Sequence, residues 1–103
     1  IKLGIISMKK FIISIDAGTT SNRSILFDLK GKPVYSSQKE FTQYFPKSGW
    51  VEHDPEEIWK TTVKTLRDAV SKAKRLKGKI LSIGITNQRE TTILWDKNTG
   101  KAV

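Results

Sequence analysis

One long helical pattern interrupts a series of short apolar runs, and this order constrains the fold more than any other feature of the sequence. The stretch "DPEE", residues 54–57, has the residues of a helix start. We expect Asp54 to be the N-cap, Pro55 to take the first helical position and Glu57 to close a capping box. Apolar residues then recur at helical spacing, and we expect the helix to end before Gly78.

Short runs on both sides of this helix are rich in β-branched residues and too short to be helices, so they predict strands. The predicted strands cover residues 11–15, 24–28, 34–41, 80–85 and 91–96. Tight turns between the first three predict an antiparallel meander, and the strand after the helix should run parallel to an earlier one. Residues 101–103 resemble the start of another strand. We therefore predict a mixed α/β sheet in an incomplete domain.

Composition narrows the class of protein. The chain has 103 residues, which favours one domain, and it has no cysteine, which excludes disulfides and thiolate metal sites. No run approaches the roughly 18 apolar residues of a membrane span. We expect a cytoplasmic protein with no membrane partner. Residues 1–7 are interpreted as an extension or remnant, with Met8 as the natural start, so that the domain portion covers residues 8–103.

The net charge of +9 admits two interpretations. A basic protein can bind nucleic acid, or it can simply have a lysine-rich surface. The densest stretch, "SKAKRLKGK" at residues 71–79, lies at the predicted helix end, where cations complement the helix dipole. No RNA-binding aromatic motif, zinc finger or basic zipper accompanies it. An anionic small molecule such as a nucleotide matches this charge better, and we expect no nucleic-acid partner.

The stretch "DAGTTSNR", residues 16–23, is the first candidate site. A glycine lets the backbone approach a ligand, amides in a tight turn attract anions, and hydroxyl and guanidinium groups suit phosphate oxygens. Asp16 could hold a hydrated Mg²⁺. The alternative is an ordinary hairpin with solvated side chains, and the sequence lacks the Gly-Lys-Ser/Thr element of a Walker A loop. The candidate phosphate ligands are Gly18, Thr19, Thr20, Ser21 and Arg23.

The second candidate site is the polar break "TNQRETT", residues 86–92, between two predicted strands. It has no glycine or proline, so it is not a typical hairpin turn. Glu90 can accept hydrogen bonds from two hydroxyl groups while Arg89 donates to a third oxygen. Both could reach one ligand only if the backbone departs from regular extension there. The alternative is a surface ion pair.

Four further residues could contribute to a site or to packing. His53, the only histidine, stands beside the predicted N-cap, a position where a structural role is more common than a catalytic one. Trp50, Trp59 and Trp95 are expected to pack, and of these Trp50 is the candidate wall of a ligand site.

Three blocks in this order resemble the FGGY family of carbohydrate kinases, and among them the glycerol kinases. The blocks are "IDAGTTSNRSILFD", "GWVEHDPEEIW" and "IGITNQRETTILWDKNTGK". The resemblance runs from about Phe11 to Val103. It implies a ribonuclease-H-like fold of the actin-like ATPase superfamily, with a five-stranded mixed sheet and helices on both faces. Ala17 departs from the pattern, because many glycerol kinases have glutamine there.

The resemblance also implies a reaction, in which the γ-phosphoryl group of ATP moves to a terminal hydroxyl of glycerol, with Mg²⁺, to give sn-glycerol 3-phosphate. The candidate phosphate ligands would then contact the nucleotide, Asp16 the metal, and Arg89 and Glu90 the glycerol. The family's catalytic aspartate lies far downstream, so we expect this chain to be an inactive N-terminal piece of a homo-oligomeric enzyme. The sequence leaves two alternative functions open. The protein could be a kinase of another polyol or sugar, or a non-catalytic ribonuclease-H-like module that binds nucleic acid.

Overall fold

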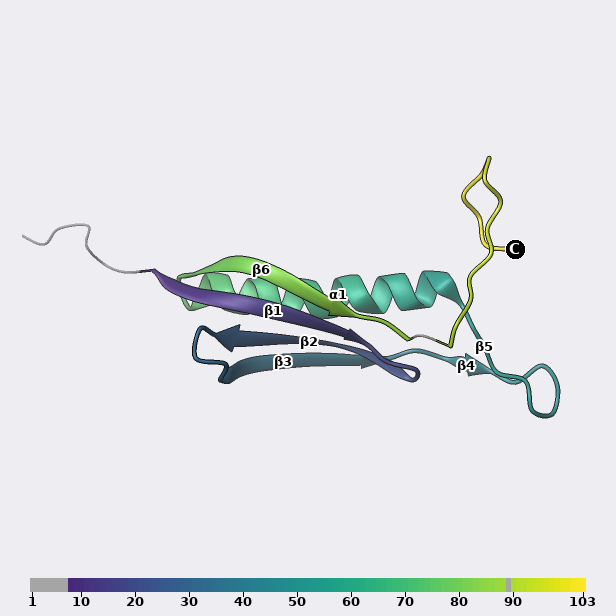
Figure 1. Ribbon diagram of the computed structural model, residues 1–103, viewed down its shortest axis with the longest axis horizontal. Coiled ribbons are helices and arrows are strands. Elements are labelled where there is room, and N and C mark those ends of the chain that lie inside the picture. The colour runs from purple at the N-terminus through teal and green to yellow at the C-terminus, as the bar shows by residue number, and fades with distance from the viewer. Residues whose placement is uncertain (1–7, 89) are drawn as a thin grey trace, which may run out of the picture.

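The computed structural model describes residues 8–88 and 90–103. A four-stranded sheet has the order β3-β2-β1-β6, and one helix, α1, lies against one face (Figure 1). Antiparallel pairing joins β1 to β2 and β2 to β3, and β6 is parallel to β1. The predicted meander, crossover helix and parallel strand are confirmed. The elements are β1 Lys9–Ala17, β2 Ser21–Asp28, β3 Pro33–Glu40, β4 Gln43–Tyr44, β5 Glu52–His53, α1 Pro55–Arg75 and β6 Gly78–Thr86.

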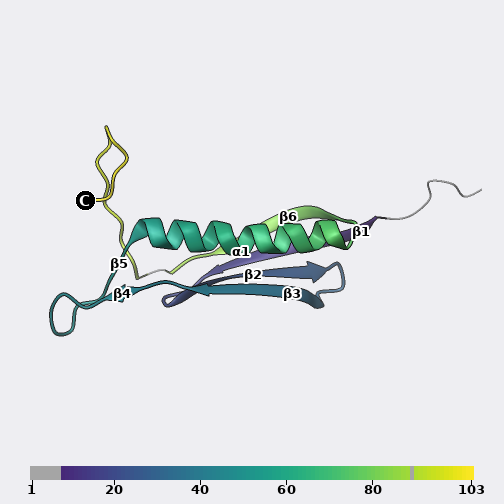
Figure 2. The same ribbon diagram turned by 180° about the vertical axis from the view of Figure 1, so that it is seen from behind.

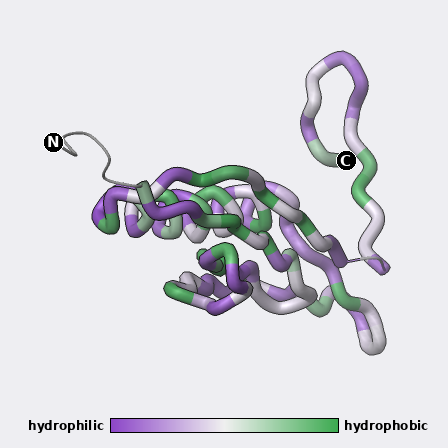
Figure 3. The backbone as a smooth tube through the Cα atoms, turned by 60° about the vertical axis from the view of Figure 1, so that its left-hand side comes forward, coloured by the Kyte–Doolittle hydropathy of each residue, from purple (hydrophilic) through white to green (hydrophobic). Residues whose placement is uncertain are grey.

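The predicted strand at residues 91–96 is wrong. In the described part of this segment, only an isolated bridge between Trp95 and Ala102 has strand pairing. The carboxylate of Asp96 accepts hydrogen bonds from the backbone N–H groups of Asn98 and Thr99, at 2.8 and 2.9 Å, and this turn folds the chain back on itself. The resulting C-terminal hairpin stands away from the two layers, and its turn is hydrophilic (Figure 3).

The helix begins as predicted, but the capping box is wrong. Asp54 accepts from the backbone N–H of Glu56 at 2.9 Å, and Pro55 is the first helical residue. The carboxylate of Glu57 instead accepts from the Tyr44 hydroxyl at 2.7 Å and from the backbone N–H of Thr42 at 2.9 Å. These two hydrogen bonds hold the pKa of Glu57 below its usual value, and the bond from Tyr44 has the larger effect. Glu57 therefore ties the helix to β4.

The helix ends before Gly78, as predicted, and the reason lies in the packing. Lys77 takes the left-handed conformation that stops the helix, with φ of 54°. A Cβ at position 78 would lie 2.1 Å from the ring of Phe11, which is a buried core residue. Glycine at position 78 thus allows β6 to pass directly over that ring.

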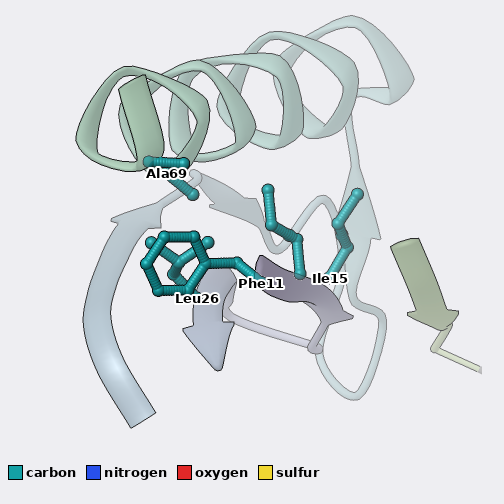
Figure 4. Packing of buried hydrophobic residues seen from close by; sticks show 6 residues of the cluster. Phe11, Ile15, Leu26 and Ala69 are labelled. Atoms are coloured by element: carbon teal, nitrogen blue, oxygen red, sulfur yellow. The ribbon is translucent and has the colours of Figure 1, made fainter. Parts of the chain in front are cut away.

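The core lies between the sheet and α1 (Figure 4). Small side chains of α1, four residues apart, face the sheet and bring the two layers close together. These helix residues are Thr61, Thr65, Ala69 and Ala73. They meet the buried apolar side chains Phe11, Ile13, Ile15 and Leu26.

Part of this interface is polar, which the sequence analysis did not predict. The side-chain amide of Asn22 donates to the hydroxyl of Thr61 at 2.6 Å, and the hydroxyls of Ser24 and Thr65 lie 2.9 Å apart. The prediction that the tryptophans pack is wrong, because Trp59 is 64% exposed and Trp95 is 63% exposed. On the helix side, the buried residues of this contact are therefore small ones rather than tryptophan.

The sheet has one covered and one uncovered face in the part of the chain that the structure describes. Seen from behind, α1 lies in front of the sheet and β4 and β5 extend beyond its end (Figure 2). No helix among the described residues is long and apolar enough to cross a membrane.

Candidate functional site

A hollow of about 530 Å³ lies where the parallel strands β1 and β6 end. Ligands of open α/β sheets commonly bind outside the carboxyl ends of the strands. Three parts of the chain meet here, namely the turn after β1, the start of α1 with β5, and the segment after β6. The lining includes Thr19, Gln43, His53, Pro55, Ile58, Glu90, Thr91 and Thr92.

The turn between β1 and β2 is tight, and its glycine is required. The backbone N–H of Gly18 donates to the carbonyl of Ser21 at 3.0 Å. A Cβ at position 18 would lie 2.9 Å from that carbonyl oxygen, which cannot move without distorting the strand. The carbonyl of Thr20 accepts from the backbone N–H of Phe41 at 3.2 Å, which fixes the turn to the residue that follows β3. Thr19 lies at the exposed tip and lines the hollow.

Ser21 and Arg23 belong to strand β2, which begins three residues before its predicted start at residue 24. Because Asn22 faces the helix, the two neighbouring side chains belong to the opposite face of the sheet. Gln38 on β3 joins them, accepting from the Arg23 guanidinium at 3.1 Å and donating to the Ser21 hydroxyl at 2.8 Å. Gln38 is a candidate site residue that the sequence analysis missed, since its partners are visible only once the strands pair.

Asp16 lies opposite Arg23 in the β1–β2 pairing. Its side chain is exposed, and one carboxylate oxygen accepts from the Thr86 hydroxyl of β6 at 3.1 Å. Within the described ranges, no group of three or more carboxylate or histidine side chains could hold a metal. A single carboxylate suits Mg²⁺, which keeps several waters and takes its other ligands from phosphate oxygens.

After β6, the described residues 87, 88 and 90–94 do not belong to a strand. β6 ends at Thr86, and the hydroxyl of Thr91 hydrogen-bonds the side-chain oxygen of Gln88 across the bend. Glu90 is exposed and lines the hollow, so its carboxylate is available to a ligand. The predicted partner of this carboxylate, Arg89, lies outside the described residues.

His53 also lines the hollow. Its ring packs edge-on against Phe41, with 5.1 Å between centroids, and its Nε2 is buried without a hydrogen-bond partner among the described residues. Trp50 does not form part of the hollow's lining, so its prediction as a ligand wall is wrong. Trp50 is instead covered by the Lys47 ammonium, 4.8 Å from the ring centroid.

Residues 11–103 match the model of the FGGY family of carbohydrate kinases, N-terminal domain. The chain is 60% identical to the glycerol kinase of Alkaliphilus metalliredigens over 96 residues, which are 93% of this chain and 19% of that protein. It is 58% identical to the glycerol kinase of Agathobacter rectalis, with the same coverage. The chain belongs to the FGGY family of carbohydrate kinases, and it spans 19% of the length of these relatives.

Solved structures agree with this assignment. The chain is similar to the crystal structure of Plasmodium falciparum glycerol kinase with ADP, with a TM-score of 0.84 and 36% identity over 93% of this chain and 19% of that one. A gluconate kinase from Lactobacillus acidophilus gives a TM-score of 0.81 at 28% identity, over 92% of this chain and 18% of that one. Members acting on different substrates therefore share this fold, and the fold alone does not select one.

Proposed function

We propose that the protein phosphorylates glycerol with ATP and Mg²⁺, yielding sn-glycerol 3-phosphate, and that residues 16–23 and 89–90 supply part of its nucleotide and glycerol sites. The observation that carries this proposal is the position of Thr19 and Glu90 on one hollow, although 70 residues separate them in the sequence. Phosphoryl transfer from a nucleotide to a polyol requires a turn that binds the phosphate anions. It also requires a group, such as a carboxylate, that accepts hydrogen bonds from the polyol hydroxyls.

Identity favours glycerol over the sugars of related kinases. Identity is 58–60% to relatives named glycerol kinase, and 28–29% to the gluconate and xylulose kinases of Lactobacillus acidophilus. Glycerol offers only hydroxyl groups, and a carboxylate accepts hydrogen bonds from two of them. Arg89 is proposed to donate to a third glycerol oxygen.

The phosphate side of the proposal depends on donors in the turn. The hydroxyls of Thr19 and Thr20 lie at the exposed tip of the tight turn that Gly18 permits, and Ser21 with Arg23 lie beside it on β2. Phosphoryl transfer depends mostly on positioning and charge stabilisation rather than on covalent chemistry by the protein. Mg²⁺ held near Asp16 would neutralise charge on the phosphates. The hydrogen bond from Thr86 fixes one oxygen of this carboxylate and leaves the other to a metal-bound water.

The pairing of the strands argues against a two-metal nuclease, which would be the catalytic version of the nucleic-acid-binding alternative. The two aspartates of the apolar strands are Asp16 on β1 and Asp28 on β2, and Asp28 pairs with Phe11. Five residue steps along β1, from Phe11 to Asp16, therefore separate them, which corresponds to about 16 Å at the usual strand rise. Two-metal nuclease sites need metals about 4 Å apart.

The proposal also concerns the activity of the 103 residues alone. The relatives are about five times longer by coverage, and the family resemblance puts the catalytic aspartate far downstream of these residues. We expect no glycerol-dependent ATP turnover by a chain of this length. Turnover by a preparation verified at this length by mass spectrometry would contradict this expectation.

The clamp is tested by Glu90→Ala in the full-length chain that carries these residues. We expect glycerol turnover to fall by at least about 100-fold, because buried hydroxyls of the substrate lose their acceptor. The matched control is Glu56→Ala, which removes an exposed carboxylate near the helix start without touching the hollow. A coupled ADP-release assay gives both values. Equal turnover by Glu90→Ala and Glu56→Ala would remove Glu90 from the site.

A further inference from the structure

The end of the sheet opposite the candidate site concentrates positive charge. Residues 8–11, 28–34 and 72–80 come together there, and we call this region the basic end. It contains nine of the chain's 19 basic residues and one of its 10 acidic residues. The basic residues are Lys9, Lys10, Lys30, Lys32, Lys72, Lys74, Arg75, Lys77 and Lys79. The start of β1, the end of α1 and the turn between β2 and β3 lie side by side at this end (Figures 1 and 2).

These cations are not neutralised within the fold. Among the described residues the only ion pair is that of Lys64 with Asp68, in the middle of α1. The one acidic residue of the basic end, Asp28, accepts from the backbone N–H groups of Lys30 and Lys32, both at 2.9 Å. Moreover, Lys10 and Lys79 are direct partners in the β1–β6 pairing. Like charges opposite each other on neighbouring strands are destabilising.

The same end carries an apolar hollow of about 610 Å³. Met8 and Leu29 are each 55% exposed and line it together with Val34 and Leu76, and Lys9, Lys10 and Lys30 stand among them. A surface that combines exposed aliphatic groups with a dense set of lysines is typical of proteins that lie on anionic bilayers, where headgroups meet the cations and aliphatic side chains enter the interface.

We propose that the basic end is a docking surface for anionic phospholipid membranes. Nucleic acid would match the charge but not the rest of the surface. Single strands are bound by stacking on exposed aromatic rings, and the described aromatic residues of this end and its border are all buried or half-buried, including Phe27 beside Asp28. Phe11 is buried, and the half-buried ring of Tyr35 is covered by the ammonium of Lys72, 6.0 Å from its centroid.

Docking at this end leaves the candidate site open to solvent. β1 runs from the basic end to the turn at Gly18, and its nine residues span about 30 Å. The prediction that the protein has no membrane partner rested on the lack of a spanning segment, which says nothing about peripheral binding. The inference does not depend on the proposed reaction.

The test is co-sedimentation of the full-length chain with vesicles of phosphatidylcholine alone, and of phosphatidylcholine and phosphatidylglycerol in equal parts. We expect binding only to the anionic vesicles, with weaker binding as salt is raised. The triple variant Lys9→Glu, Lys30→Glu, Lys79→Glu should bind at least about 100-fold more weakly, from roughly fivefold for each lysine near the surface. Leu29→Ser should weaken binding without changing its salt dependence.

The matched control is Lys39→Glu, Lys97→Glu, Lys101→Glu, which changes the net charge equally but lies outside the basic end. It should retain most of the binding. Equal losses in the two triple variants, no binding to anionic vesicles, or tighter binding to a DNA duplex that competes with vesicles would each overturn the proposal. A measurement without variants gives a second test, because vesicles should protect lysines of the basic end, and not Lys39, from reductive methylation.

Discussion

The two ends of the sheet carry similar kinds of residue but use them differently. At the candidate site, Asp16 lies next to the end of β1, and among the described residues its carboxylate has a single hydrogen bond, from Thr86. At the basic end, Asp28 ends an apolar strand, but one of its carboxylate oxygens already accepts two backbone N–H groups of its own turn. A polar residue at a strand end is thus available to a ligand only where the local backbone does not already use it.

The largest effect that separates the ends is expected from Asp16→Asn in the full-length chain. This change keeps the side chain's shape but removes its charge, so turnover should fall by about 10²–10³-fold. Asp28→Asn is the control, because an amide oxygen can still accept the two backbone N–H groups of the turn. Steady-state ADP release measures both. Unchanged turnover in Asp16→Asn would show that the two carboxylates do not differ in function.

A smaller effect should distinguish the two glycine turns. Gly18→Ala places a methyl group 2.9 Å from the carbonyl oxygen of Ser21, and should lower the local free energy of opening by about 2 kcal/mol. Gly31→Ala meets no atom but must keep a φ of +82°, which should cost about 1 kcal/mol. Hydrogen exchange of the β1 and β2 amides measures both. A greater loss in Gly31→Ala would reverse the order.

Replacing a lysine with glutamate should stabilise the fold at the basic end but not at the end of the sheet that carries the candidate site. Lys79→Glu replaces a lysine pair on β1 and β6 with an ion pair to Lys10, and should stabilise by about 0.5 kcal/mol. Lys39→Glu, whose partner on β2 is Asn22, should change stability by less. The exchange rates of the β6 amides provide the measurement. Destabilisation by Lys79→Glu would mean that Lys10 and Lys79 do not repel each other.

The smallest effect lies between the ends, at Asp68 of α1. Hydrogen bonds from Lys64 at 2.8 Å and from Ser37 at 2.7 Å hold its pKa below the usual value. A carboxylate with a lowered folded pKa contributes stability above its unfolded pKa of about 3.9, and this is lost as the pH falls through the folded pKa. The contribution should be a few tenths of a kcal/mol, since the pair is partly exposed.

Carboxyl ¹³C shifts followed by NMR across this acidic range measure the Asp68 pKa directly. Lys64→Ala should raise the pKa more than Ser37→Ala, because the lysine is the larger cause. The reverse order would assign the shift to the serine hydroxyl.

Patterns that depend on neighbours in the chain were predicted well. The meander, the helix from Pro55 and the parallel strand follow from period, turn residues and the N-cap, all of which are local. Glu57 was assigned to a capping box because its spacing fits, but Tyr44 and Thr42 compete for it in the folded chain. Such competition between partners distant in sequence is not visible in a spacing rule.

The candidate site was predicted less completely for the same reason. Thr19 and Glu90 were identified, and the structure brings them to one hollow. Gln38 was missed, because it joins Ser21 to Arg23 only through the register of β2 and β3. The tryptophans were misassigned: all three are more than half exposed, and the helix residues buried against the sheet are threonine and alanine.

The most direct measurement of the central claim is the specificity constant, kcat/KM, of the full-length chain for glycerol, gluconate and xylulose, each with ATP and Mg²⁺. The account predicts a specificity constant for glycerol at least about 100-fold above those for gluconate and xylulose. A site that hydrogen-bonds the hydroxyls of one substrate rejects a substrate whose hydroxyls lie elsewhere. A higher value for gluconate or xylulose, or no phosphorylation of glycerol, would contradict it.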